Sequence, residues 1–278
     1  MRASSLGLLA ASLLLGCSPQ RIVAVDPFPC GDGGVSGCVL LSDQLIGFWK
    51  LDEQPGSTIA HDSSLQNNNG TLMGLDANVA WVADGPEGRA LAPQGRGYVQ
   101  VPNSTSINSI TTAVTMAAWI YIDNTITDYA TAISRQSTTA AYAYGQHYHL
   151  SIRSDMKPAM FITTPASNQV FIPGPTAIPM QTWVHIAGTY DGSMARLYLD
   201  GVDVADAPVT GPFAKDNTPV ILSGNGNATN PVNYLEKIPG RLNDVLLYRR
   251  ALGADEIARL RNGALIGWNP RQDASVGQ

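Results

Sequence analysis

The stretch TWVHIAGTYDGSMARLYLDG (Thr182–Gly201) predicts two antiparallel strands joined by a tight turn. Its residues alternate between two faces, one starting at Trp183 and the other at Val184, and the alternation resumes after Asp191-Gly192. Period-two patterning rich in Val, Ile, Tyr and Trp is typical of strands, and Asp and Gly tolerate the positive φ of a hairpin turn. The stretch contains a lone histidine with no second acid or base beside it. We therefore predict that this hairpin has a structural role and not a catalytic one.

The composition of the chain favours short strands joined by many loops. Its 278 residues include 27 Gly, 18 Pro and 18 Asp but only 4 Glu. Asp, Gly and Pro form turns, whereas Glu favours helices. This length accommodates one large domain or two small ones. The net charge is −5 and the sequence has no basic stripe to neutralise phosphates, which argues against a nucleic-acid partner.

The first 17 residues, MRASSLGLLAASLLLGC, are typical of an export signal. Arg2 precedes an apolar run from Leu6 to Leu15, which is too short to span a bilayer that requires ~20 apolar residues. The segment LLGC, ending at Cys17, resembles the bacterial lipobox, in which the cysteine becomes the lipidated first residue of the mature protein. We therefore expect an exported protein, anchored to the cell envelope by a lipid on Cys17. The next residue is Ser18 and not the Asp that resembles an inner-membrane retention signal, so we expect the outer membrane. The alternative to a lipid anchor is an ordinary cleaved signal peptide in which Cys17 occurs by chance.

The sequence of residues 18–41 predicts a tether that ends in a loop closed by a disulfide. The segment is rich in Gly and Pro and has little periodicity. Cys30 and Cys38 flank the sequence GDGGVSG, and an exported chain meets an oxidising compartment. With Cys17 set aside for the lipid, these two cysteines pair most simply with each other as a disulfide. A metal site would need two further soft ligands nearby, and none is present in the sequence around them.

Strand patterns continue along the rest of the chain and are separated by turn signals. In Thr111–Ile122 both faces are largely apolar, as expected for a strand inside a sandwich of two sheets. Only GADEIARLRNG (Gly253–Gly263) has helical spacing, with acidic residues in its first turn and a glycine at its end. The sequence thus predicts an all-β, antiparallel two-sheet sandwich with a short C-terminal helix. The other strand candidates are LIGFWKL (45–51), YVQV (98–101), YHLSIR (148–153), AMFITT (159–164), PVILSG (219–224) and GRLNDVLLY (240–248).

Four of these segments, taken in order, resemble the laminin-G-like family of concanavalin A-like jelly-roll domains. In that family an aromatic strand leads to an Asp-Ser-Ser turn and an Asn/Gly-rich loop, as in residues 45–72. A central strand (VTMAAWIY), the hairpin with W-H-A-x-T-Y-D-G, and a closing strand with its helix follow. The resemblance covers residues 42–263 as one domain and leaves 264–278 as a tail. It implies a jelly roll of two curved sheets with a concave face.

The resemblance implies a binding module, and we expect a glycan or a surface protein as its partner. The alternatives are a structural or protein-interaction lipoprotein and a polysaccharide-active hydrolase or lyase on the same fold. Glycoside hydrolysis needs two carboxylates that face each other across the scissile bond. None of the four Glu has a second carboxylate two residues further along a strand. We therefore predict a monomeric, non-catalytic protein that meets the membrane only through its lipid, although a site assembled from distant strands stays open.

Candidate ligand contacts lie in the stretch AYAYGQHYHL (141–150): Tyr142, Tyr144, His147, Tyr148 and His149. The tyrosines could present their rings to sugar faces, and the two histidines project together if this stretch is a strand. The alternative is an ordinary edge strand with partly exposed tyrosines. A zinc site at the histidine pair is disfavoured, because no third His or Cys is positioned by the sequence.

A structural calcium ion is predicted between the two ends of the domain. The loop HDSSLQNNNG (61–70) concentrates the oxygen ligands that calcium prefers, and Asp244 is an acid within an apolar strand. The resemblance implies that the opening loop and the closing strand approach each other. The alternative is an Asn-rich surface turn and an Asp244 that caps a loop amide. The expected ligands are Asp62, Asn67, Asn69, the carbonyl of Gly70, and Asp244.

Overall fold

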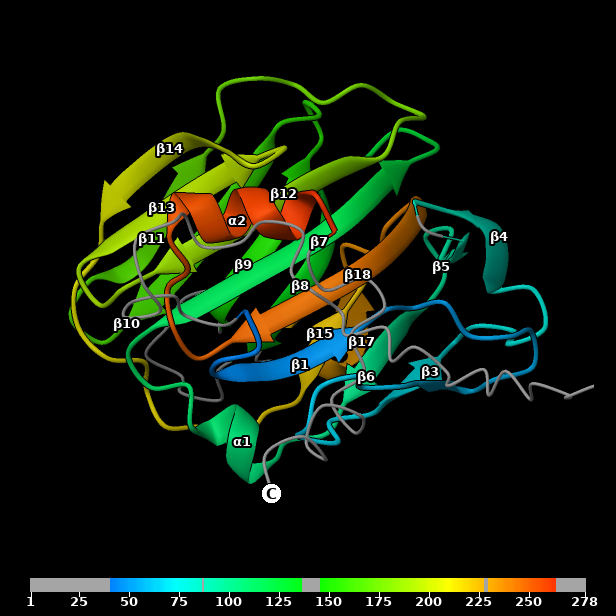
Figure 1. Ribbon diagram of the computed structural model, residues 1–278, viewed down its shortest axis with the longest axis horizontal. Coiled ribbons are helices and arrows are strands. Elements are labelled where there is room, and N and C mark those ends of the chain that lie inside the picture. The colour runs from blue at the N-terminus through cyan, green and yellow to red at the C-terminus, as the bar shows by residue number, and fades with distance from the viewer. Residues whose placement is uncertain (1–40, 87, 137–145, 228–229, 264–278) are drawn as a thin grey trace, which may run out of the picture.

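The computed structural model describes residues 41–86, 88–136, 146–227 and 230–263. They form two antiparallel sheets that face each other, with a short helix near the C-terminal end of the chain (Figure 1). This arrangement confirms the predicted all-β sandwich, and its topology is that of a jelly roll. We call the sheet nearer the viewer in Figure 1 the front sheet and the other the back sheet.

The front sheet contains β14 (Val202–Pro208), β13 (Met194–Leu199), β12 (Val184–Tyr190), β7 (Val114–Ile122), β18 (Gly240–Tyr248), β5 (Gly88–Leu91), β4 (Trp81–Gly85) and β1 (Leu45–Trp49). The first seven are hydrogen-bonded in this order. One edge of β18 pairs with β7, and its other edge pairs with β5 near one end and with β1 near the other. The first and the last strands of the chain are therefore neighbours.

The back sheet contains, in order, β11 (Asn168–Pro173), β10 (Pro158–Thr164), β9 (Gln146–Arg153), β8 (Tyr129–Gln136), β15 (Val220–Leu222), β6 (Tyr98–Val101), β3 (Gly70–Met73) and β2 (Ile59–Ala60). A separate hairpin of β16 (Asn225–Asn227) and β17 (Asn230–Leu235) follows β15 and contacts β8. The described residues also form two helices, α1 (Thr105–Asn108) and α2 (Ala254–Arg261). The sequence predicted α2 but not α1, whose single turn is too short to show a helical period.

The hairpin predicted from Thr182–Gly201 is β12 and β13 joined at Asp191-Gly192. The side-chain oxygen Oδ1 of Asp191 accepts hydrogen bonds from the backbone N–H groups of Ser193 and Met194, and Gly192 has a φ of +95°. These are the features of a tight turn in which a residue with positive φ is required. The alternation is also as predicted, because Val184 and Tyr190 lie in the core on the face opposite to His185.

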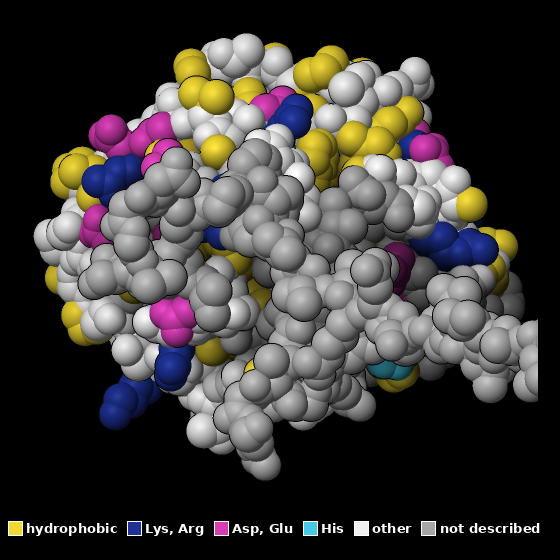
Figure 2. All heavy atoms as spheres, viewed as in Figure 1, with side chains coloured by type: hydrophobic (Ala, Val, Ile, Leu, Met, Phe, Trp, Pro, Cys, Tyr) yellow, Lys and Arg dark blue, Asp and Glu magenta, His cyan; other side chains and the backbone are white. Residues whose placement is uncertain are grey.

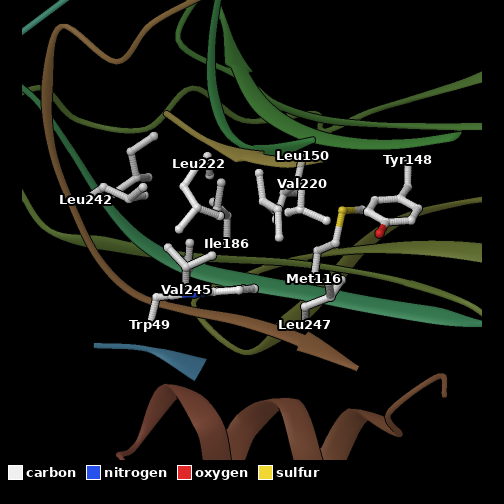
Figure 3. Close-up of a cluster of buried hydrophobic side chains, with 14 of the residues drawn as sticks. Trp49, Met116, Tyr148, Leu150, Ile186, Val220, Leu222, Leu242, Val245 and Leu247 are labelled. Atoms are coloured by element: carbon white, nitrogen blue, oxygen red, sulfur yellow. The ribbon is translucent and has the colours of Figure 1, made fainter. Parts of the chain in front are cut away.

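The space between the sheets is filled by one continuous apolar core (Figure 3). Alternate residues of each strand point into it, among them Met116, Ile186 and Leu150. Trp49 is fully buried, and its ring nitrogen donates to the backbone carbonyl of Asn68 at 2.8 Å. Burial of this apolar surface, together with hydrogen bonds such as that of Trp49, stabilises the sandwich.

The outer face of the front sheet is partly covered by α2, which lies across β12 and β7 in Figure 1. Ile257 and Leu260 of the helix pack on Ala117, Ala187 and Tyr198 to form a smaller second core. Figure 2 shows that on this face the basic and acidic side chains of the described residues are scattered in small groups rather than gathered into one basic patch.

Candidate functional site

The alternation along β9 divides the predicted ligand residues between two faces. Tyr148 points into the core, where it is 1% exposed and packs edge-on against Phe213 at a centroid distance of 5.7 Å. Figure 3 shows its ring close to Met116. The prediction that Tyr148 presents its ring to a ligand is therefore wrong, because neighbours in a strand point to opposite faces. Tyr142 and Tyr144 lie outside the described residues.

His147 and His149 point to the outer face of the back sheet, but both are buried at 1% and 2% exposure. Each histidine lies beside a carboxylate. Nε2 of His147 is 3.5 Å from Oδ2 of Asp216, and Nε2 of His149 is 3.3 Å from Oε2 of Glu236. Burial lowers the pKa of His147 to about 4 and that of His149 to about 3, so both rings are neutral near pH 7.

Aromatic rings surround His149 on this outer face. Phe161 stacks on His149 with a centroid distance of 5.0 Å and an interplanar angle of 16°, and Tyr129 meets both rings edge-on. Phe171 continues the row at 4.9 Å from Phe161, and the guanidinium of Arg153 lies 5.5 Å from its ring centroid. We call Tyr129, His149, Phe161 and Phe171 the aromatic cluster. Phe171 is 40% exposed, so the row runs from a buried histidine to an open ring.

Glu236 lies next to the aromatic cluster, in the chain that returns from β17 towards β18. Its Oε2 accepts a hydrogen bond from the hydroxyl of Thr131 at 2.8 Å, and its backbone carbonyl accepts from the N–H of the same threonine. Burial raises the pKa of the Glu236 carboxyl, and the nearby charge of Asp128 raises it further, while hydrogen bonds from Thr131 and Asn225 lower it. The backbone of Glu236 has a φ of +57°, an uncommon conformation for a residue with a side chain.

The hydrogen bonds at this point form a short chain. Oγ1 of Thr131 lies 2.6 Å from Nε2 of His149 and donates its single proton to Glu236. A hydroxyl has one proton to give, so Nε2 of His149 carries the proton of the first bond and donates to Thr131. The two hydrogen bonds thus run in sequence from His149 through Thr131 to the carboxylate of Glu236.

The sequence did not identify Phe161, Phe171 or Glu236 as site residues. A signal was present for Phe161, which is the aromatic residue between the core-facing Met160 and Ile162 in AMFITT. Glu236 could not be found in this way, because the loop that carries it reaches β8 only through the fold.

The loop predicted to bind calcium is held by hydrogen bonds of its own. Oδ1 of Asp62 accepts from the N–H groups of Phe48 and Ser64, and Oδ2 accepts from the hydroxyl of Ser64 and the N–H of Asn68. Oδ1 of Asn69 accepts from the N–H of Asp62. Asn67 is exposed with a φ of +56°, and Gly70 begins β3. The oxygens of Asp62 thus already have four donors.

Asp62 and Asp244 lie on opposite sides of β1. The segment at Asp62 lies along one edge of β1, bridged to Trp49, and β18 pairs with the other edge. Two strand spacings separate the backbones, which is about 10 Å. Asp244 is a half-buried residue with a φ of +44° at an irregularity of β18, and its N–H donates to the carbonyl of Lys50. Calcium held by the loop, with Asp244 as a further ligand, stays a prediction.

The described residues contain no group of three or more His, Cys, Asp and Glu side chains arranged to hold a metal ion. A pocket of about 470 Å³ opens at the other side of the sandwich, between the loops after β3 and β5, with Asp76, Arg96 and Asn124 in its wall. No aromatic residue lines this pocket, so we place the candidate site at the aromatic cluster.

Cys17, Cys30 and Cys38 lie outside the described residues. Within the described part of the chain, neither helix has the length and apolar character needed to cross a bilayer.

Several solved structures share the fold. Domain 4 of an extracellular arabinanase from Geobacillus stearothermophilus, solved with arabinotriose, matches with a TM-score of 0.57 and 17% identity, over 78% of this chain and 98% of that domain. The binding domain of Paraclostridial mosquitocidal protein 1 matches with a TM-score of 0.58 and 18% identity, over 82% of this chain and 54% of the other. No curated protein matches the sequence.

Trypanosoma rangeli sialidase matches with a TM-score of 0.58 and 15% identity, over 84% of this chain but only 35% of the sialidase. The arabinanase and the sialidase are enzymes, which contradicts our prediction that this chain is not one. The prediction relied on the absence of a familiar carboxylate motif along one strand, and residues brought together from separate strands escape such a test. At this level of identity the likeness shows the fold alone and assigns no reaction to this chain.

The sequence itself matches the model of one protein family, over residues 93–258 and thus over more than half of the chain. The match begins ahead of β6 and ends within α2, so it contains the aromatic cluster, Glu236 and the β12–β13 hairpin. It confirms the resemblance drawn from the motifs. The chain belongs to the concanavalin A-like lectin/glucanase superfamily.

Proposed function

We propose that this domain binds carbohydrate on the outer face of the back sheet, with the aromatic cluster as its contact surface. The observation that carries the proposal is the row of contacting rings that ends at Phe171, which is 40% exposed. An aromatic ring offers a flat apolar face to the C–H groups of a sugar, while polar neighbours fix the hydroxyl groups. Arg153 and Glu236 supply such neighbours. The arabinotriose bound to the similar arabinanase domain supports a glycan as the ligand.

Replacement of Phe171 by Ala is expected to weaken glycan binding about tenfold, since an exposed contact aromatic contributes 1–3 kcal/mol to binding. The protein is first applied to a glycan array, and the strongest hit is then titrated by calorimetry. Val202→Ala is the matched control, because Val202 is also exposed, at 64%, but lies on β14 of the front sheet. Equal affinities for Phe171→Ala and the parent protein would contradict a ligand on this face. Release of reducing ends, measured on the same samples, reports any cleavage of the bound glycan.

We further propose that the protein is exported and held at the cell envelope by a lipid on Cys17, with residues 18–41 as the tether of the sandwich. The supporting observation is the apolar run that ends at LLGC. Such an anchor would place a glycan-binding face outside the cytoplasm.

The anchor is tested with Cys17→Ser in the full chain. The variant is expected to lose incorporation of labelled fatty acid and to move from the membrane fraction to the soluble fraction, because the thiol is the site of acylation. Cys30→Ser is the control, since it removes a thiol that is not expected to carry lipid. Membrane fractionation of Cys17→Ser at the level of the parent protein would overturn the anchor.

A further inference from the structure

Glu236 is a largely buried carboxylate that lacks a cationic partner among the described residues. Its side chain is 15% exposed, and its polar contacts are the hydroxyl of Thr131, the side chain of Asn225 and the ring of His149. No Lys or Arg in the described part of the chain forms an ion pair with it. A carboxylate removed from water is costly unless a positive charge or several hydrogen bonds compensate it.

His149 does not supply the missing charge. Its ring is buried and stacked on Phe161, and burial keeps the pKa of the imidazole near 3. The nearest arginine on this face is Arg153, whose guanidinium is 2.9 Å from the carboxylate of Asp155 and faces the ring of Phe171. A cation that neutralises Glu236 would therefore have to come from a group outside the described residues.

The surroundings of Glu236 suit a ligand that combines a sugar ring with a positive charge. Tyr129 and Phe161 pack around His149, whose Nε2 is 3.3 Å from the carboxylate, and the faces of such aromatic rings attract cations. Asp128 adds a second negative charge close enough to affect the Glu236 carboxyl. On the same face of β9, Oγ of Ser151 is fully buried and has no hydrogen-bond partner. This hydroxyl is an unsatisfied polar group next to the position of Thr131 in β8.

We propose that the outer face of the back sheet binds an amino saccharide, a sugar whose free amine is protonated, with Glu236 receiving the ammonium group and the aromatic cluster receiving the sugar ring. The inference rests on the proposed carbohydrate binding and adds the chemical class of the ligand. An ammonium group provides N–H donors for Oε1 and Oε2 of Glu236, and a charge-assisted hydrogen bond is stronger than one between neutral groups. A neutral sugar would leave the carboxylate without its counter-charge.

The test compares two ligands of equal length that differ at the 2-amino group, which is a charged ammonium in one and a neutral acetamide in the other. The purified protein is titrated with a glucosamine oligosaccharide and with the corresponding N-acetylglucosamine oligosaccharide, at a pH below neutrality where the amines are protonated. Binding of the glucosamine oligosaccharide is expected to be at least about tenfold tighter, as for one hydrogen bond to a charged group. Glu236→Gln keeps the shape and can still accept from Thr131, and it should reduce this preference to near one.

Glu53→Gln is the matched control. Glu53 is likewise a buried carboxyl with a raised pKa, and it accepts from the N–H of His61 beside β2, at the opposite edge of the back sheet from β11. This control should keep the preference, and thermal melts confirm that both variants are folded. Equal binding of the two oligosaccharides, or an unchanged preference in Glu236→Gln, overturns the inference while carbohydrate binding stands. Equally tight binding of a lysine oligomer also overturns it, in favour of a basic protein segment. Failure to bind any glycan on the array removes the proposed function itself.

Discussion

Acidification from pH 6.5 to about pH 5.5 is expected to lower the free energy of unfolding of the domain by about 2–3 kcal/mol. Three of the four histidines are buried, and burial lowers the pKa of His147 to about 4 and of His149 and His185 to about 3. The unfolded chain takes up these protons near pH 6.5, whereas the folded protein does not. Stability is therefore full above pH 6.5 and is lost as the pH falls towards 4. Glu53 and Glu236, whose pKa values are raised, act in the opposite direction and reduce the loss.

Urea denaturation at a series of pH values measures this effect. His185→Gln should remove about one third of the loss, since it removes one of three buried imidazoles of similar behaviour. His61→Gln is the control, because the side chain of His61 is 65% exposed and the three buried rings remain. A stability that stays constant over this pH range would contradict the burial of neutral histidines, as would an identical pH dependence in His185→Gln.

Replacement of Asp62 by Ala is expected to lower the free energy of unfolding by about 3 kcal/mol, because hydrogen bonds to a charged acceptor contribute ~1.5–3 kcal/mol each and several are lost together. Asp62 accepts four such bonds and fastens the loop after β2 to the edge of β1. Asp76→Ala is the control, since its Oδ1 accepts only from Asn78 in an exposed turn. A loss in Asp62→Ala no larger than in Asp76→Ala would show that the loop is held by other contacts.

The same variants test calcium at this loop. If calcium binds there, melting of the calcium-loaded parent protein should fall by several degrees on addition of a chelator, because a ligand bound only to the folded state stabilises it. Asp62→Ala should then lose this difference. Melting of the parent that is identical with chelator and with excess calcium would eliminate the ion and leave the four hydrogen bonds as the only function of Asp62.

Local pattern was sufficient to predict most of the fold. The strands β7, β12, β13 and β18 show alternation, and the turn at Asp191-Gly192 sets the register of one hairpin. Short edge strands such as β2, with two residues, carry too little pattern to be read. The sheet to which each strand belongs follows from contacts between distant segments, and the family resemblance rather than the period supplied that order.

The candidate site was less accessible to sequence reasoning. The second half of the stretch 141–150 is part of a strand, as predicted. However, the prediction grouped Tyr148 with His147 and His149 as ligand contacts, although adjacent residues of a strand point to opposite faces. The partners of these histidines come from elsewhere. Asp216 and Glu236 are far along the chain and meet β9 only in the folded protein. No local motif marks such a meeting. The absence of a familiar carboxylate motif led to the prediction of a non-catalytic protein, which the enzymes among the structural neighbours contradict.

The pairing of β1 with β18 has a consequence for how the protein is made. Leu45 pairs with Tyr248, so the front sheet cannot close until nearly the whole domain has been synthesised. Topologies dominated by contacts between distant segments fold slowly, because the chain loses loop entropy before those contacts form. A polypeptide whose first strand pairs with its last therefore completes its fold only when synthesis of the domain is nearly finished, and until then its unpaired strand edges are open to other partners.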